Sequence, residues 1–221
     1  MAIQPDEIIR SRRKTLAITI DSLGRVVVRA PLFMSEARIF AFLAEKESWI
    51  LKKKEERAGA GICLPPENLH GYELLLLGKR HVVCLADVKR VLYDEAAERV
   101  FVPLENSEKQ LVKWLKKNAK EILTKATERA AKRMGVTYKL VSITSARGRW
   151  GSCSADNSLR YSFRLLYAPQ DVIEYVVIHE LSHVKHKNHS KEFWKEVEKY
   201  ASDWKEKRKW LKMHGALMDV F

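Results

Sequence analysis

Histidines are concentrated in one short segment of the chain, YVVIHELSHVKHKNHSKEFW at positions 175–194. This segment holds four of the seven histidines, and its apolar spacing predicts a helix that runs through His183. Residues four apart lie on one face of a helix, so His179 and His183 can both reach one metal ion. Glu180 is rotated toward the same side, where it can meet a water molecule on that ion. Positions 179–183 therefore match the HExxH motif. On a helix, this motif places both histidines on one metal-binding face.

A third metal ligand must come from outside this helical turn, because a catalytic zinc site takes three protein ligands and leaves one position for water. His189 is the best placed, since it follows His183 by six residues and stands just before the next predicted helix. Asn188 tolerates the left-handed backbone conformation, which we expect to end the first helix and turn the chain back. The alternatives for the third ligand are His186, Glu192 and Glu196.

A surface helix that is rich in histidine by chance is the alternative to a metal site. The residues before His179, VIEYVVI, indicate instead that the helix is largely buried. A buried carboxylate such as Glu180 is unfavourable unless it has a partner. A metal site accounts for both features.

The first hundred residues predict a small β-rich domain with one long helix. Runs of β-branched residues separated by turn residues predict two hairpins and two further short strands, at 16–31, 73–86, 89–94 and 99–103. The hairpins are expected to turn at residues 22–24 and at Gly78–Lys79. Helical spacing over 35–57 predicts the helix, with Ser35 as its N-cap, and a Gly- and Pro-rich loop follows at 58–71.

The character of the sequence changes near residue 106, and we expect two domains, residues 1–106 and residues 107–221. The second begins with a long basic amphipathic helix over 107–134, with Ser107 as N-cap and Gly135 as the residue that ends it. Three strands are predicted next, at about 138–144, 149–154 and 158–166. Two helices are expected after the HExxH helix, the first of them capped by Ser190.

The positive charge of the chain is concentrated in its second half. The formal net charge is +13. Residues 1–106 hold 17 Lys and Arg against 15 Asp and Glu, whereas residues 107–221 hold 24 against 13. A net charge of +11 on the second half attracts polyanions, so weak binding of nucleic acid or nucleotides is expected there. A basic surface that only keeps the protein soluble is the alternative.

The cysteines and the first residues of the chain indicate the cellular compartment of the protein. Cys63, Cys84 and Cys153 are odd in number and widely spaced, so they form neither a disulfide framework nor a CxxC metal site. The start of the chain has early acidic residues and no apolar region typical of a signal peptide. No apolar run approaches the length of a membrane span. We therefore expect a cytoplasmic protein outside the membrane, and the sequence does not indicate an oligomeric state.

Over nearly its whole length the chain resembles the YgjP-like metallopeptidase family, which is related to the SprT-like and WLM-type zinc proteases. The most specific matching segments are RWGSCS (149–154), RLLYAP (164–169), YVVIHELSH (175–183), NHSKEFW (188–194) and RKWLKMHGALM (208–218). The resemblance implies an α+β fold in which a small β-rich N-terminal domain precedes a zincin-like catalytic domain with the HExxH helix beside a small sheet. It also implies Zn²⁺ bound by His179, His183 and His189, with Glu180 as the catalytic carboxylate. The chain departs from the family at Ser162, where Asn is usual. This departure concerns substrate contacts rather than the metal site.

These features predict a zinc-dependent metallohydrolase, namely a metallopeptidase that acts on a peptide or protein substrate. Zinc lowers the pKa of its bound water, and Glu180 takes the proton and later passes it to the leaving amine. One alternative is a metal-dependent nucleotide phosphohydrolase, such as a nucleoside triphosphate pyrophosphatase, although the sequence has no P-loop and no carboxylate cluster for Mg²⁺. A nucleic-acid-associated protease is another. A nucleic-acid-binding protein with a structural zinc is disfavoured, because such a site has no use for Glu180.

The sequence does not identify the group that stabilises the oxyanion. Tyr161, Arg164 and Tyr175 are candidates, and each is equally suited to a structural role. The RWGSCS strand is a candidate for pairing with an extended peptide at a sheet edge. Its side chains, Trp150 and Cys153 among them, are expected to serve in packing.

Overall fold

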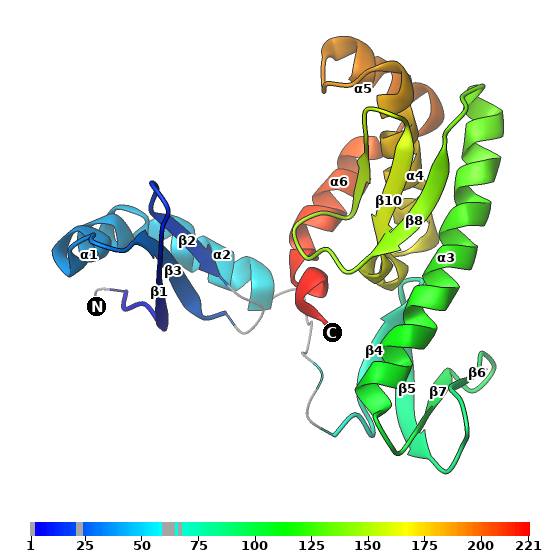
Figure 1. The fold of residues 1–221 in the computed structure, drawn as a ribbon, viewed down its shortest axis with the longest axis horizontal. Helices are drawn as coiled ribbons and strands as arrows, with labels where there is room; N and C mark the ends of the chain where they lie inside the picture. The colour runs from blue at the N-terminus through cyan, green and yellow to red at the C-terminus, as the bar shows by residue number, and fades with distance from the viewer. Residues whose placement is uncertain (1–2, 21–23, 59–64, 66–67) are drawn as a thin grey trace. The chain divides into compact units, whose positions relative to one another are not determined.

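The structure is a computed structural model that describes residues 3–20, 24–58, 65 and 68–221 (Figure 1). Cys63, the predicted turn residues 22 and 23, and most of the predicted loop 58–71 lie outside the described residues. The chain forms two compact units. They comprise residues 1–64 with 213–219, and residues 65–212 with 220–221.

The first unit is built on a three-stranded sheet in the order β1-β3-β2. Its strands are β1 (Glu7–Ser11), β2 (Ala17–Ile20) and β3 (Val26–Pro31). The antiparallel pairing of β2 with β3 confirms the first predicted hairpin, whereas the parallel pairing of β1 with β3 was not predicted. Alternate residues of β3 pack against apolar residues of the following helices. This core comprises Ile20, Val26, Val28, Ala30, Ile39, Leu43 and Ile50.

The single helix predicted over 35–57 is wrong, because two helices, α1 (Glu36–Glu45) and α2 (Glu47–Ala58), meet at Lys46. The N–H of Lys46 is shared between the carbonyl groups of Phe42, at 3.1 Å, and Leu43, at 3.2 Å. Such sharing tightens the last turn of a helix and ends its regular pattern. The helical spacing continues across the junction, so the sequence carries no sign of the break.

The second unit begins with a four-stranded sheet in the order β4-β5-β7-β6. Its strands are β4 (Glu73–Leu76), β5 (Lys79–Ala86), β6 (Leu92–Asp94) and β7 (Arg99–Pro103). The hairpin of β4 and β5 turns at Leu77 and Gly78, one residue earlier than predicted. Both residues have positive φ, 52° and 79°, as a type I′ turn requires. The N–H of Leu77 donates to the carbonyl of Leu166 at 2.7 Å, a distant contact that helps to hold this uncommon conformation.

Helix α3 (Ser107–Met134) runs along the second unit and packs against β7, β8 (Leu140–Thr144) and α4 (Gln170–Lys185) (Figure 1). It spans the predicted range, but Asn106 rather than Ser107 stands at the N-cap, and it ends at Gly135 with φ 62°, as predicted. Its buried stripe includes Leu111, Leu115, Ala119 and Leu123, each four residues after the last. None of the helices in the described part of the chain is both long enough and apolar enough to cross a membrane.

A second sheet, in the order β8-β10-β9, lies beside the HExxH helix. Its strands are β8 (Leu140–Thr144), β9 (Gly151–Cys153) and β10 (Ser158–Ser162). β10 pairs with β8 in parallel and with β9 in antiparallel, so β9 is an edge strand. The chain continues through η1 (Phe163–Tyr167), α4 (Gln170–Lys185), α5 (Lys191–Tyr200), α6 (Trp204–Met213) and η2 (Gly215–Asp219). Because α4 packs against β9, α3 and α5, the expected α+β fold with the HExxH helix beside a small sheet is confirmed.

The two compact units divide near residue 64, whereas the sequence places a domain boundary at residue 106. The sheet of β4–β7 belongs to the second unit, where β7 packs against α3. The division of the chain into functional domains of residues 1–106 and 107–221 stays a prediction.

Candidate metal centre

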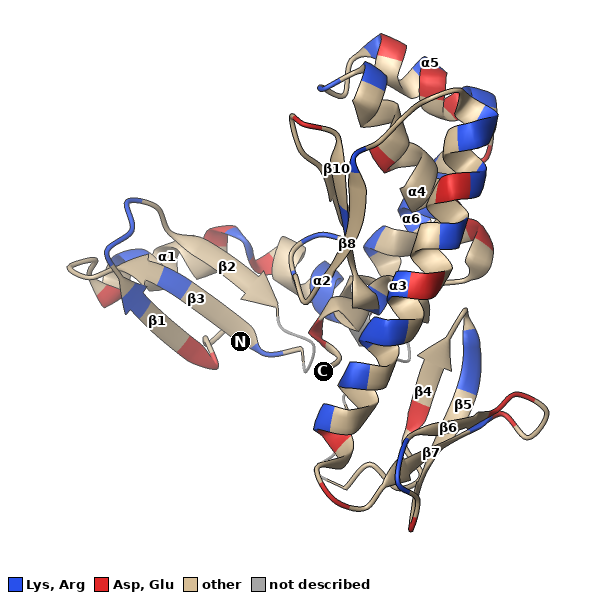
Figure 2. Cartoon of the chain, turned by 45° about the vertical axis from the view of Figure 1, so that its right-hand side comes forward, with Lys and Arg blue, Asp and Glu red and all other residues tan. Residues whose placement is uncertain are grey.

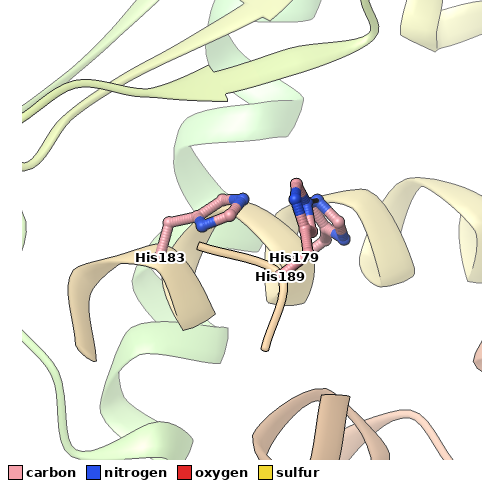
Figure 3. Close-up of side chains that lie close together, drawn as sticks. All are labelled: His179, His183 and His189. Atoms are coloured by element: carbon pink, nitrogen blue, oxygen red, sulfur yellow. Dashed lines mark hydrogen bonds between the residues drawn. The ribbon is translucent and has the colours of Figure 1, made fainter. Parts of the chain in front are cut away.

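Three histidines from two parts of the sequence meet at one point of the second unit (Figure 3). His179 and His183 lie on α4, and His189 lies in the segment between α4 and α5. One ring nitrogen from each lies within 4.8 Å of the other two. The Nε2 atoms of His179 and His189 are 3.1 Å apart. Of the alternatives for a third ligand, the structure brings His189 to the pair on α4.

The spacing of these nitrogen atoms fits a zinc ion. Two nitrogen ligands of one tetrahedral zinc lie about 3.3 Å apart, because each Zn–N bond is about 2.0–2.1 Å long. The separation of 3.1 Å between His179 Nε2 and His189 Nε2 is close to this value. Imidazole nitrogen is also a ligand type that zinc prefers over the oxygen-rich sets of Mg²⁺ and Ca²⁺. The donor set therefore suits a zinc ion with three protein ligands and one open position.

The ring of His183 is oriented by the backbone. Its Nδ1 lies 3.0 Å from the carbonyl oxygen of His186, the residue that ends α4. Since a carbonyl only accepts hydrogen bonds, Nδ1 carries the proton, and Nε2 keeps the lone pair that can bind a metal. His186 thus acts through its main chain, and its side chain is not part of the cluster.

Burial keeps two of the imidazoles in the form that binds metal. Burial, with a smaller contribution from the charges of His183, His189 and Arg208, lowers the pKa of His179 to about 3. The Nδ1 atom of His179 is itself buried and has no hydrogen-bond partner among the described residues. Burial also lowers the pKa of His183. Both rings are therefore neutral at pH 7, as metal ligation requires.

Glu180 is buried against the edge strand β9. Its residue is 6% exposed, and burial raises the pKa of its carboxyl to about 8, against the opposing charge of Arg149. Gly151 faces it directly, since a Cβ at this position would lie 2.7 Å from Glu180 Oε1 and 2.8 Å from Cγ. Any side chain at 151 would displace the carboxylate. The sequence indicated Glu180 but not Gly151, although a glycine inside a predicted strand is a signal of close approach.

Aromatic rings of α5 and α6 enclose the histidines. Phe193 stacks on His183 with 4.5 Å between ring centroids, and Trp194 stacks on His189 at 5.8 Å. Trp204 in turn stacks on Trp194 at 4.2 Å. These contacts restrict how the imidazoles can rotate. This role was not predicted, and the signal for it in the sequence is an aromatic pair four and five residues after His189.

The turn that delivers His189 differs from its prediction. The left-handed conformation expected at Asn188 does not occur; instead His186 ends α4 in an extended conformation, with φ −129° and ψ 102°. Asn188 accepts a hydrogen bond through Oδ1 from the N–H of Ser190 at 3.2 Å, so its side chain, and not its backbone, shapes the turn. Ser190 caps α5 as predicted, accepting from the N–H of Phe193 at 3.4 Å.

The two glutamates of α5 that were alternatives for the third ligand lie outside the histidine cluster. Glu196 is 4% exposed, and its carboxylate oxygens lie 2.7 Å from Lys185 Nζ and 2.8 Å from Lys199 Nζ. These ion pairs join the end of α4 to α5. Glu192 is exposed in the first turn of α5.

The candidate oxyanion donors are placed differently from one another. Tyr161 is fully buried, and its hydroxyl accepts a hydrogen bond from Thr127 of α3 at 3.3 Å. Arg164 is 2% exposed and donates to main-chain carbonyl groups, which is a structural role. Tyr175 lies one turn before His179, with 6.0 Å between the two ring centroids. Of the three, Tyr175 is the one that adjoins a histidine of the cluster.

A cavity of about 290 Å³ lies along β9 and β10. Gly151 is part of its lining and also contacts Glu180, so a single residue of β9 separates the cavity from the carboxylate. The polar groups of the lining are hydroxyls and guanidinium groups, with no carboxylate among the described residues. They belong to Thr144, Ser152, Ser162, Arg149 and Arg160.

A family model and two solved structures match the chain. The crystal structure of the metallopeptidase zymogen abylysin of Pyrococcus abyssi is similar at 25% identity, over 41% of this chain and 92% of that chain, with a TM-score of 0.38. That of the metallopeptidase zymogen jannalysin of Methanocaldococcus jannaschii is similar at 18% identity, over 42% and 95%, with a TM-score of 0.38. No curated protein matches the chain. The family model of the YgjP-like metallopeptidase domain matches residues 14–214, which include all three histidines and Glu180, and the chain therefore belongs to the YgjP-like metallopeptidase family.

Proposed function

We propose that this metallopeptidase is zinc-dependent, with His179, His183 and His189 as ligands and Glu180 as general base. The observation that carries this is the convergence of three imidazole nitrogens within 4.8 Å, next to a buried carboxylate. A structural zinc site is closed by a fourth protein ligand. Among the described residues, no fourth His, Cys, Asp or Glu completes this cluster, which favours a catalytic site with an open position.

The chain's own residues provide for proton transfer. When bound, zinc supplies a Lewis acid that acidifies water and polarises a carbonyl group. Burial raises the pKa of the Glu180 carboxyl to about 8 in the metal-free protein. A bound cation would lower this pKa, because positive charge nearby favours the carboxylate form. As a carboxylate it accepts a proton from the attacking water and delivers it to the leaving amine. Its contact with Gly151 fixes the position of the carboxylate during both steps.

The peptide substrate, in this account, lies along β9. This strand is at the edge of its sheet and packs against α4, the helix that carries Glu180. An extended peptide that pairs with a sheet edge is held by main-chain hydrogen bonds, which tolerate many side chains. Tyr175, next to His179, is the protein group best placed to donate to the oxyanion.

A second candidate function, hydrolysis of a nucleotide phosphoanhydride, is favoured by one observation. Arg149 and Arg160 line the cavity beside Glu180, and neither forms an ion pair with a described carboxylate, although the charge of Arg149 acts on Glu180. Guanidinium groups suit phosphate oxygens. The same pair would also accept an acidic side chain of a peptide, so a direct comparison of substrates is needed.

A cytoplasmic location is part of the proposal. Cys84 and Cys153 are free thiols in the structure, as expected in a reducing compartment. Burial raises the pKa of Cys153, which makes it a poor nucleophile.

The test is a screen of the zinc-loaded protein against a peptide library and against nucleoside triphosphates, with Glu180→Gln in parallel. We expect the wild type to cleave peptides, and the variant to keep its zinc while losing roughly 10²–10⁴-fold in rate. Cleavage of nucleoside triphosphates alone would favour the second candidate. Hydrolysis by the variant at the wild-type rate would exclude Glu180 as the base.

A further inference from the structure

The second unit has a large groove that is separate from the histidine cluster. Its volume is about 950 Å³, and it is formed by the first turns of α3, Arg147 in the segment before β9, and Phe221. In Figure 1, α5 lies beside the opposite, C-terminal end of α3. The lining of the groove shares no residue with the histidine cluster.

The cations of this groove form no ion pair with any described residue, whereas several cations elsewhere in the second unit do. Lys109, Lys113 and Arg147 form no ion pair with any described residue, and Lys116 lies 5.6 Å over the ring of Phe163. By contrast, carboxylates neutralise many other cations of the unit, including Lys125, Arg133, Lys139, Lys185, Lys199 and Lys207. Figure 2 shows how basic positions recur along the N-terminal half of α3. Glu108 is the one acidic side chain in the described lining, against four cationic side chains.

The lysines are arranged along a line. Positions 109, 113 and 116 lie on one face of α3, because residues three and four apart are neighbours on a helix. They span about 10 Å along the helix axis, at about 1.5 Å per residue. A polynucleotide strand placed along this face brings roughly two or three phosphates within reach of them.

The groove also has apolar surface between its cations. Val112 and the ring of Phe221 are half-buried parts of its lining. Tyr72 holds the ring of Phe221 edge-on, with 5.9 Å between centroids and 86° between planes. Binding sites for single strands combine cations for the backbone with aromatic faces for the bases. A duplex, with its bases stacked inside, has no use for an aromatic face in a hollow.

We propose that this groove binds single-stranded nucleic acid without sequence preference, through Lys109, Lys113, Lys116 and Arg147 on phosphates and Phe221 against a base. The groove then recruits the protein to a polynucleotide, and the metal centre acts on whatever protein lies nearby. This binding requires neither zinc nor Glu180, so it stands or falls independently of the peptidase activity.

The experiment measures fluorescence anisotropy of a labelled oligothymidylate as the full-length protein is added at rising salt. Lys109→Gln/Lys113→Gln/Lys116→Gln is compared with Lys205→Gln/Lys209→Gln/Lys212→Gln on α6, which removes the same charge at the same spacing. We expect the first variant to bind at least about tenfold more weakly and to lower the slope of log affinity against log salt by roughly two. The α6 variant should stay within about twofold of the wild type.

Three further arms fix the identity of the ligand. Phe221→Ala should weaken binding of the single strand at least about fivefold, with thermal unfolding unchanged to show that the fold is intact. A duplex of the same sequence and a polyglutamate chain should both bind more weakly than the single strand. Equal weakening by the two lysine variants, equal binding of duplex or polyglutamate, or no binding at low salt would each overturn the assignment.

Discussion

At Gly151, the absence of a side chain decides where the Glu180 carboxylate can lie. The contact is close, at 2.7 Å from an ideal Cβ to Oε1, and it involves the reactive end of the acid. Burial in this space also raises the pKa of Glu180 to about 8. The HExxH spacing predicted a role for this acid from the sequence alone. The glycine that makes room for it lies 29 positions earlier, and only the packing of β9 on α4 reveals the link.

Gly151→Ala is therefore expected to lower kcat/KM by at least about tenfold while leaving zinc content unchanged, because a displacement near 1 Å at a reacting group costs up to about 10²-fold. Steady-state kinetics and metal analysis on the same preparation check this. Gly148→Ala is the matched control, since a Cβ at 148 meets nothing within 4 Å. Equal activity of the two variants would show that the contact at Gly151 has no catalytic consequence.

At the scale of elements, the junction of α4 and α5 places His189, the proposed third ligand. The extended backbone at His186, the Asn188 side chain and the Ser190 cap set the path of the turn. Glu196 then joins the two helices through Lys185 and Lys199. The cap was predictable, because it depends on residues within one turn. The ion pairs were not, because they depend on how two helices pack.

Glu196→Gln is expected to lower the free energy of unfolding at pH 7 by on the order of 1 kcal/mol, a modest value because both lysines are partly exposed, at 39% and 65%. Burial raises the pKa of Glu196, but hydrogen bonds from Lys185 and Lys199 outweigh it, and the net pKa lies below the ordinary 4.5. Because the pKa of Glu196 is lower in the folded than in the unfolded protein, its ionised form stabilises the fold at pH values above the unfolded-state pKa. This stabilisation is lost as the pH falls through the folded-state pKa of Glu196.

The difference between wild type and Glu196→Gln should therefore shrink as pH falls below about 4.5. Denaturant unfolding of the zinc-free protein at pH 7 and at about pH 4 measures it. Glu198→Gln, at an exposed position of the same helix, is the control. A difference that stays constant across this range would contradict the assignment of the stabilisation to the Glu196 ion pairs.

At the scale of the whole molecule, local features were predictable and long-range ones were not. The helix ending at Gly135 and the Ser190 cap follow from short-range chemistry. The parallel pairing of β1 with β3, the interruption at Lys46 and the packing of the β4–β7 sheet in the second unit depend on distant contacts. The histidine cluster is an intermediate case, because two of its histidines share one helix face and the position of the third depends on a turn.

The central claim is that His179, His183 and His189 hold one zinc ion, and metal analysis of purified variants tests it most directly. We expect about one zinc per chain in the wild type and in His186→Ala, because His186 contributes only its carbonyl group, which alanine retains. We expect His189→Ala to lose most of its zinc, because two ligands remain on α4. Full zinc content in His189→Ala together with loss of zinc in His186→Ala would contradict the account.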